Sequence, residues 1–222
     1  MLLAVDSSTQ TLGLALYDGA QVVGEMIWQT HNRHTVELAP AVDELLQRCN
    51  VKAENLQALA VALGPGSFTS LRIGLALAKG LALALNIPIV GVPTLEILVA
   101  AQPVRDIPLV AVLQAGRNRL AAGWYAAIKG HWQAQGEASV CTVEELAEKI
   151  DKPTLVCGEL SSIQRQLLAH KHKNVLLASP AQALRRPSYL AEIGWKHWQS
   201  GKVNDVVTLS PIYLHVAEAI PA

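Results

Sequence analysis

The same order of predicted elements occurs twice along this chain, and that order constrains the fold more than any other feature of the sequence. The first half begins with a strand (2–5), a polar turn (6–10) and a hairpin (11–17 with 21–28). A helix (36–49), a strand (56–63), a helix (69–85), a strand (87–92) and a helix (94–101) follow. Helices that alternate with strands in this way favour a mixed sheet with crossover helices on its faces.

A proline-containing stretch at residues 102–108 separates this series from a second one. The second series again begins with a strand (109–113), a turn (114–118) and a hairpin (120–128 with 132–140). A helix (142–150), a strand (153–157), a helix (161–170), a strand (174–177) and a helix (187–199) follow. The order of elements repeats although the residue identities do not. We therefore predict an α/β chain of two duplicated lobes, residues 1–103 and 104–222, each built on one mixed sheet.

Composition limits the cellular compartments and the classes of protein that fit this sequence. The 18 Lys and Arg balance the 18 Asp and Glu, which argues against a chain that grips nucleic acid by positive charge alone. The longest apolar stretch, residues 73–85, contains Lys79 and is shorter than the roughly 20 residues of a membrane-spanning helix. We expect no signal peptide from the first residues of the sequence. Because Cys49, Cys141 and Cys157 form no CxxC pair, we also expect buried thiols in a reducing compartment. These features predict a cytoplasmic protein without a membrane segment.

The first candidate site is the polar turn after the first strand, Asp6-Ser7-Ser8-Thr9-Gln10. Backbone amides and hydroxyls in a tight turn can hold a phosphate group, and a carboxylate can hold a hydrated magnesium ion. An ordinary hairpin turn uses the same residue types, so both interpretations stay open.

The second candidate is the segment Gly64-Pro-Gly66-Ser67-Phe-Thr69, which joins a predicted strand to a predicted helix. The glycines allow sharp turns, and the hydroxyls are candidate helix caps. Free amides at a helix N-terminus suit an anion, but neither the P-loop nor the dinucleotide-binding pattern is present. The segment is therefore either a phosphate loop or a capped helix start.

The helix that follows is apolar on all sides and must be covered on all sides. Its row of small residues, Gly74, Ala78 and Ala82, would let another backbone approach closely. It is either a central helix covered by its own chain or a helix whose outer face packs on another chain. For the second alternative, the predicted contact residues on this helix and on helix 36–49 are Val36, Leu38, Leu45, Leu71, Leu75, Ala78 and Leu81.

The other clusters of polar residues do not indicate a functional site. His31 and His34 have a spacing that metal ligands can use, but no third ligand lies near them in the sequence, so we expect a solvated loop and no metal site. No nucleophile elbow or catalytic triad is recognisable. The pair Arg185-Arg186 is too short a basic cluster to indicate nucleic-acid contact.

Taken together, these segments resemble the TsaB (YeaZ) family. The resemblance is carried by Leu-Ala-Val-Asp6-Ser-Ser-Thr9, by Gly64-Pro-Gly-Ser-Phe-Thr-Ser-Leu-Arg-Ile-Gly74, by Pro93-Thr-Leu-Glu96, by His34 ahead of Leu38-Ala-Pro40 and by Pro211-Ile-Tyr-Leu214. It implies the actin-like ATPase fold and a role in making threonylcarbamoyladenosine next to the tRNA anticodon. It further implies a non-catalytic subunit that activates a paralogous partner, TsaD, which carries the metal and the transfer chemistry.

The resemblance also implies that the ATPase TsaE joins the pair and that tRNA is reached only through the complex. An exposed apolar helix would in addition allow two copies of the chain to pair. No cofactor is then required. The second turn, with Gln114, Gly116 and Arg117, lacks the aspartate that many relatives carry near Gln114, which leaves at most weak ATP or ADP binding. The alternatives are a stand-alone ATP-dependent phosphotransferase that uses Asp6, Ser8 and Thr9 and, ranked third, a glycoprotease-like metallopeptidase.

Overall fold

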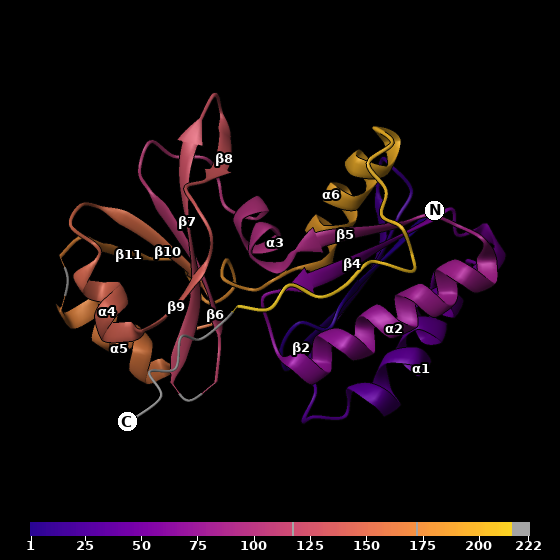
Figure 1. Cartoon of the computed structure of the whole chain (residues 1–222), viewed down its shortest axis with the longest axis horizontal. Coiled ribbons are helices and arrows are strands. Elements are labelled where there is room, and N and C mark those ends of the chain that lie inside the picture. Colours follow the sequence, from indigo (N-terminus) through magenta and orange to yellow (C-terminus); the bar gives the residue numbers. More distant parts are fainter. Residues whose placement is uncertain (117, 172, 215–222) are drawn as a thin grey trace. The chain divides into compact units, whose positions relative to one another are not determined.

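The computed structural model describes residues 1–116, 118–171 and 173–214, which divide into two compact units (Figure 1). Unit 1 comprises Met1–Ala101 and Arg185–Ile212, and the described part of unit 2 comprises Gln102–Leu184 with Tyr213 and Leu214. The first division lies close to the expected one, but residues 104–222 do not form one lobe. The expectation is corrected because helix α6 (Pro187–Gln199) packs on the sheet of unit 1.

The sheet of unit 1 has the strand order β3-β2-β1-β4-β5. The strands span Leu2–Asp6 (β1), Thr11–Tyr17 (β2), Val22–Gln29 (β3), Ala58–Gly64 (β4) and Ile89–Pro93 (β5). β1 pairs antiparallel with β2 and parallel with β4, so the hairpin and the crossover segment meet on the two sides of β1. Every residue of β1 is buried, as expected for a central strand with both faces covered.

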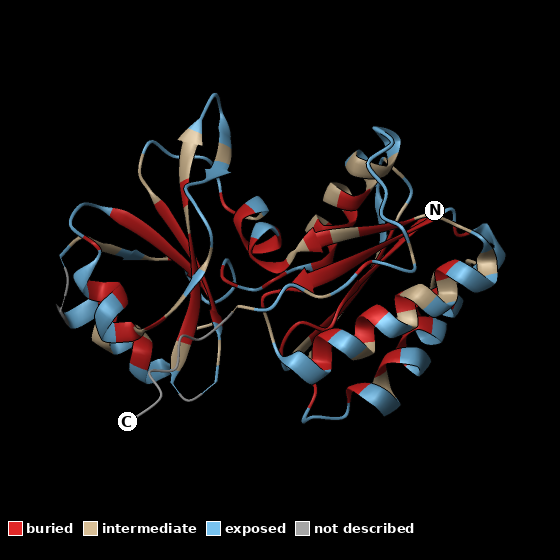
Figure 2. Cartoon of the chain, in the orientation of Figure 1, coloured by how far each residue is buried: buried red, intermediate tan, exposed pale blue. Residues whose placement is uncertain are grey.

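Helices cover both faces of this sheet. α1 (His34–Arg48) and α2 (Phe68–Leu85) pack on the face that carries Leu3 and Val5, while α6 covers the face that carries Leu2 and Ala4. The short helices η1 (Ala53–Asn55) and α3 (Thr94–Ala100) lie in the connections before β4 and after β5. Figure 2 shows α1 and α2 with buried inner sides and exposed outer sides.

Unit 2 repeats the strand order of unit 1. Its sheet runs β11-β10-β6-β7-β8, with β9 also paired to β7, and its strands span Leu109–Gln114 (β6), Arg119–Ile128 (β7), His131–Ala134 (β8), Ser139–Thr142 (β9), Thr154–Gly158 (β10) and Val175–Leu177 (β11). α4 (Val143–Glu148) and α5 (Ser162–Lys171) follow the hairpin and β10. The expected strand over 132–140 is split in two, because β8 and β9 pair with different parts of β7.

The thiols differ in burial. Cys141 and Cys157 are buried, and burial raises the pKa of Cys157 to about 12. Cys49, at the end of α1, is only half-buried, so the expectation of three buried thiols is wrong for this residue. Its position at the helix end, beside strand β3, leaves one side open to solvent.

By length and composition, α2 alone among the helices of the described residues could cross a membrane, and 33% of it is buried within the chain. Its inner side, which includes Leu71, Leu75 and Ala78, belongs to the interior of unit 1. The chain therefore covers one side of this helix and leaves the other side accessible, and packing of that side on another chain stays a prediction.

Candidate functional site

The polar turn after β1 lies inside unit 1. Asp6, Ser7, Ser8 and Thr9 are buried, and Gln10 is exposed. A turn with a carboxylate and three hydroxyls in the interior needs hydrogen-bond partners for each group, since an unpaired buried polar group is costly. The partners of these groups therefore decide what the turn can do chemically.

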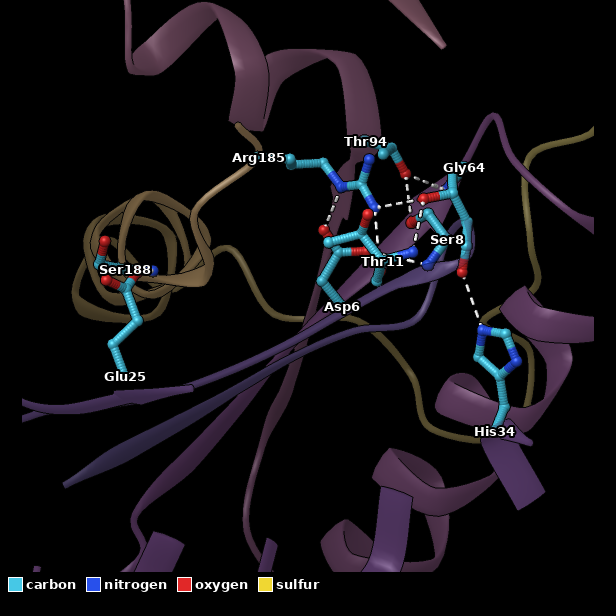
Figure 3. Close-up of polar contacts among 10 residues, drawn as sticks. Asp6, Ser8, Thr11, Glu25, His34, Gly64, Thr94, Arg185 and Ser188 are labelled. Atoms are coloured by element: carbon cyan, nitrogen blue, oxygen red, sulfur yellow. Dashed lines mark hydrogen bonds and ion pairs between the residues drawn. The ribbon is translucent and has the colours of Figure 1, made fainter. Parts of the chain in front are cut away.

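Asp6 is paired with an arginine from a distant part of the chain (Figure 3). Its Oδ1 accepts a hydrogen bond from the backbone N–H of Ser8 at 2.9 Å, and its Oδ2 accepts one from Nε of Arg185. The same guanidinium donates from Nη2 to Oγ1 of Thr9 at 3.0 Å and to the carbonyl of Thr11 at 3.3 Å. The two charged side chains are 2% and 1% exposed, so each is the compensating charge of the other.

The hydroxyls of the turn bind the elements around it. Oγ of Ser8 and Oγ1 of Thr94 are 2.8 Å apart, and Oγ1 of Thr94 accepts a hydrogen bond from the N–H of Gly64 at 2.9 Å. Oγ of Ser7 donates to the carbonyl of Ser70 at 2.7 Å. The turn is thus tied to the end of β4, to α2 and to α3.

Two glycines let α2 approach the turn. A Cβ on Gly66 would meet the backbone oxygen of Ser8, and a Cβ on Gly74 would meet Oγ of Ser7. The carbonyl of Ser8 also accepts a hydrogen bond from the N–H of Ser67 at 2.7 Å. Glycine is required at both positions because the helix and the turn are in direct contact.

The segment before α2 is a capped helix start. Gly64 has a φ of +113°, and Ser67 is the N-cap whose side chain accepts from the N–H of Ser70 at 3.4 Å. Oγ of Ser70 donates to Oγ of Ser67 at 2.9 Å. Thr69 is exposed. The N–H groups of Ser67 and Ser70 are directed to the turn and to the cap, which favours the capped helix start over the phosphate loop.

α1 is tied to the same turn through His34. Its Nε2 is 2.8 Å from the carbonyl of Thr9, and its ring is buried at the first position of the helix. His31 is exposed, so only this one of the two expected loop histidines is in a loop. Within the described part of the chain, no three His, Cys, Asp or Glu side chains gather as ligands for a metal ion.

Beside this network, Glu25 of β3 holds the start of α6. Nε of Arg186 donates to its Oε2 at 3.0 Å, and the N–H of Ser188 donates to its Oε1 at 2.9 Å. Burial raises the pKa of Glu25, but the hydrogen bonds from Arg186 and Ser188 outweigh burial and hold this pKa below its usual value. This contact fixes the chain directly after Arg185.

The second turn, in unit 2, has a different set of contacts. Nε2 of Gln114 donates to Oε1 of Gln164 at 2.7 Å and to the carbonyl of Glu159 at 3.0 Å. Gly116 has a φ of +72° and open space where a Cβ would lie. Arg117 lies outside the described residues. Nε of Arg119 is buried, and it has no hydrogen-bond partner among the residues that the structure describes.

Most of the predicted contact residues for a partner chain face inward, and that prediction is corrected. Leu38, Leu45, Leu71, Leu75 and Ala78 are buried in unit 1, because they lie on the sides of the two helices that face the sheet. Two members of the predicted set remain accessible. Val36 is 58% exposed, and Leu81 is half-buried.

These contacts test whether the turn fits a metal–nucleotide site. A hydrated magnesium ion binds to carboxylate oxygens that are accessible from solvent. Here the carboxylate of Asp6 is buried and ion-paired with Arg185, and the neighbouring hydroxyls are engaged by Thr94 and Ser70. The residues of this turn therefore do not fit such a site.

Sequence reasoning missed three members of this network. The sequence alone places Arg185 in a basic cluster without a role, His34 in a loop, and Thr94 only in a family pattern. Their side chains meet the turn through tertiary contacts. The only sequence signals were a lone arginine pair before a proline and the position of His34 just ahead of an amphipathic helix.

Comparison with known proteins assigns the family. The tRNA threonylcarbamoyladenosine biosynthesis protein TsaB of Bacillus subtilis is 35% identical over 98% of this chain and 95% of its own length. The chain belongs to the TsaB family. YeaZ from Pseudomonas aeruginosa superposes with a TM-score of 0.78 at 25% identity, covering 96% of this chain and 99% of that one. The resemblance inferred from the motifs is thereby confirmed, as is the fold of two duplicated actin-like lobes.

The family of the transferase itself also matches. The family model described as TsaD, tRNA N6-adenosine threonylcarbamoyltransferase, covers residues 24–194. A tRNA N6-adenosine threonylcarbamoyltransferase of Magnetococcus marinus is 32% identical over 61% of this chain, which corresponds to 38% of that enzyme. This TsaB-family chain has a role in threonylcarbamoyladenosine biosynthesis, and it is similar to part of a longer transferase.

Proposed function

We propose that this chain is the non-catalytic partner subunit of a TsaD-type threonylcarbamoyltransferase and activates it through the outer face of α1 and α2. The observation that carries the proposal is this accessible face, which is apolar on the outer side of α2 and near the start of α1. In the same proposal the partner carries the chemistry on tRNA, the ATPase TsaE joins the pair, and the complex works in the cytoplasm.

The outer face of α2 is lined by small and apolar residues. Ala76, Gly80, Leu83 and Ala84 are exposed. They share one side of the helix, because Gly80 lies four residues after Ala76 and three and four residues before Leu83 and Ala84. Leu83 is 64% exposed. Small residues in such a stripe let a second helix approach closely, and exposed apolar area of this kind is typical of interaction sites.

α1 extends this face. Val36, Ala39 and Pro40 are exposed on the helix that packs beside α2. The occupant that fits is another helix pair of the same design. The TsaD model matches residues 24–194, a range that includes both helices, so a TsaD-type chain would carry a counterpart of each. Two similar helix pairs can then pack face to face, as in a two-fold symmetric interface.

The decisive experiment mixes the purified chain with the TsaD-type chain from the same cell and measures complex formation by size exclusion and calorimetry. Ala76→Glu places a charge at the centre of the α2 stripe. We expect it to weaken the complex at least roughly 100-fold, because a charge would be buried without a partner. Threonylcarbamoyl transfer to tRNA in the reconstituted mixture should fall in parallel.

The matched control is Gln199→Glu, which adds the same charge at an exposed position of α6, on the other face of the sheet. It should bind the partner as the unmodified chain does. Circular dichroism must show that both variants are folded. Undiminished binding by a folded Ala76→Glu variant would contradict the proposal, while loss of self-association alone would assign the face to a homodimer.

We propose also that the subunit needs no cofactor. The support is the buried ion pair of Asp6 with Arg185, which takes the carboxylate that a magnesium–nucleotide complex would use. Calorimetric titration of the isolated chain with ATP and with ADP, each in excess magnesium, should give no binding heat. Micromolar, magnesium-dependent binding that is lost in Asp6→Asn would instead favour the stand-alone phosphotransferase.

A further inference from the structure

We propose that Arg185 is a built-in counter-cation of the turn after β1, standing where Asp6 could otherwise hold a divalent metal ion. The arginine converts a turn with the residue types of a metal–phosphate site into a rigid anchor for α1 and α2. This assigns a role to a residue 179 positions away from Asp6 in the sequence.

The first step of the argument is charge. Asp6 and Arg185 are almost completely inaccessible to water, and each would be an uncompensated buried charge without the other. A carboxylate at this place needs a cation, and the chain provides one of its own. A metal ion that arrived at Asp6 would have to displace the guanidinium from the interior.

The second step is geometry. The guanidinium is a planar group with several donors, and here it contacts three residues at once, Asp6, Thr9 and the carbonyl of Thr11 (Figure 3). It therefore links the end of β1, the turn and the start of β2. A lysine ammonium on the same backbone position is a point charge and cannot reproduce this set of contacts.

The third step is what the fixed turn holds. The carbonyl of Thr9 contacts His34 at the start of α1, and the carbonyl of Ser8 accepts from Ser67 at the start of α2. Both helices are thus anchored at their N-terminal ends to the turn that Arg185 closes. Because these are the helices of the proposed partner face, this consequence for binding rests on the proposed function, whereas the role of Arg185 as a counter-cation does not.

The experiment measures thermal unfolding of the full isolated chain, with and without millimolar MgCl2 at constant ionic strength. Arg185→Ala should lower the Tm by roughly 10 °C, since it leaves the carboxylate buried and unpaired. Magnesium should restore much of this loss, because the vacated space next to Asp6 admits a cation. The unmodified chain and the double variant Asp6→Asn/Arg185→Ala should not respond to magnesium.

Three results would overturn the proposal. They are a Tm of Arg185→Ala equal to that of the unmodified chain, a lowered Tm that magnesium does not raise, and a magnesium response of the unmodified chain that Asp6→Asn abolishes. If Arg185→Ala does not fold, the milder Arg185→Gln is used with the same criteria. Its neutral amide still reaches for the threonine partners but cannot balance the carboxylate.

Binding to the TsaD-type chain supplies the second readout. Arg185→Gln should weaken binding about 10-fold, and magnesium should restore affinity together with Tm. A magnesium-responsive Tm combined with unchanged binding would uphold the counter-cation and contradict only its consequence for the interface. The failure of the two proposals is therefore distinguishable, because the Tm series uses the isolated chain.

Discussion

Leu75→Glu is expected to unfold unit 1. Leu75 is 6% exposed and belongs to the interior formed by α1, α2 and the sheet. A carboxylate there would have no cation among its apolar neighbours, and the cost is roughly 4 kcal/mol or more. Since a domain of this size is stable by about 5–15 kcal/mol, most of the stability of unit 1 would be lost. Urea unfolding followed by circular dichroism measures the effect.

The neighbouring substitution Ala76→Glu is the matched control, because it places the same side chain on the outer side of the same helix turn. It should change the free energy of unfolding by less than about 0.5 kcal/mol. Adjacent positions thus give opposite results: one variant loses the fold, and the other keeps the fold and loses the partner. Equal stabilities for the two variants would contradict the assignment of inner and outer sides of α2.

A second pair of substitutions is expected to show that the two glycines of α2 contribute differently to the stability of unit 1. Gly74→Ala should destabilise unit 1 by about 1–3 kcal/mol, because its Cβ would collide with Oγ of Ser7 in the buried turn. Gly80→Ala should stabilise it by about 0.5–1 kcal/mol, because its Cβ meets nothing within 4 Å and alanine is the better helix former. The same chemical change therefore has opposite signs six residues apart.

The free energies of unfolding of both variants, from urea titrations, test this pair. If Gly74→Ala were as stable as the unmodified chain, the close contact of α2 with the turn would not exist in solution. Gly80→Ala adds information on the partner face. A more stable variant with weaker binding to the TsaD-type chain would indicate that the second helix approaches directly at Gly80.

Local patterns predicted most of the fold. Apolar runs bounded by turns identified β1, β4 and β6 to within two residues, and the three-to-four-residue spacing of Leu38, Val42 and Leu45 identified α1. The hairpin was found from Asp18-Gly19 between two apolar runs. These signals are short-range, because strand alternation, helix periodicity and turn chemistry act between residues close in sequence.

The boundary of the units was predicted less well. α6 follows unit 2 along the chain but belongs to unit 1, and its amphipathic pattern says only that one side is covered. The pattern does not say which sheet provides the cover. The tertiary contact at Gly194 shows that the sheet of unit 1 provides it, since a Cβ at this position of α6 would collide with Ala60 of β4.

The site shows the same limit more sharply. The residue types at Asp6–Thr9 suit a phosphate turn and an interior junction equally well. The ion pair with Arg185 distinguishes the two, and it joins residues that no spacing rule connects. For this reason the sequence raised the question of a nucleotide site, and only the tertiary contacts supplied the physical argument against one.

The apolar helix α2 marks the division between the two kinds of information. The sequence by itself determined that residues 69–85 form a helix that is apolar on every side and therefore needs cover beyond what one sheet provides. Only the tertiary structure decided which side the sheet covers, because close packing selected the side with Leu71, Leu75 and Ala78 and turned Ala76, Gly80 and Leu83 outward. Periodicity cannot make that choice when every side is apolar.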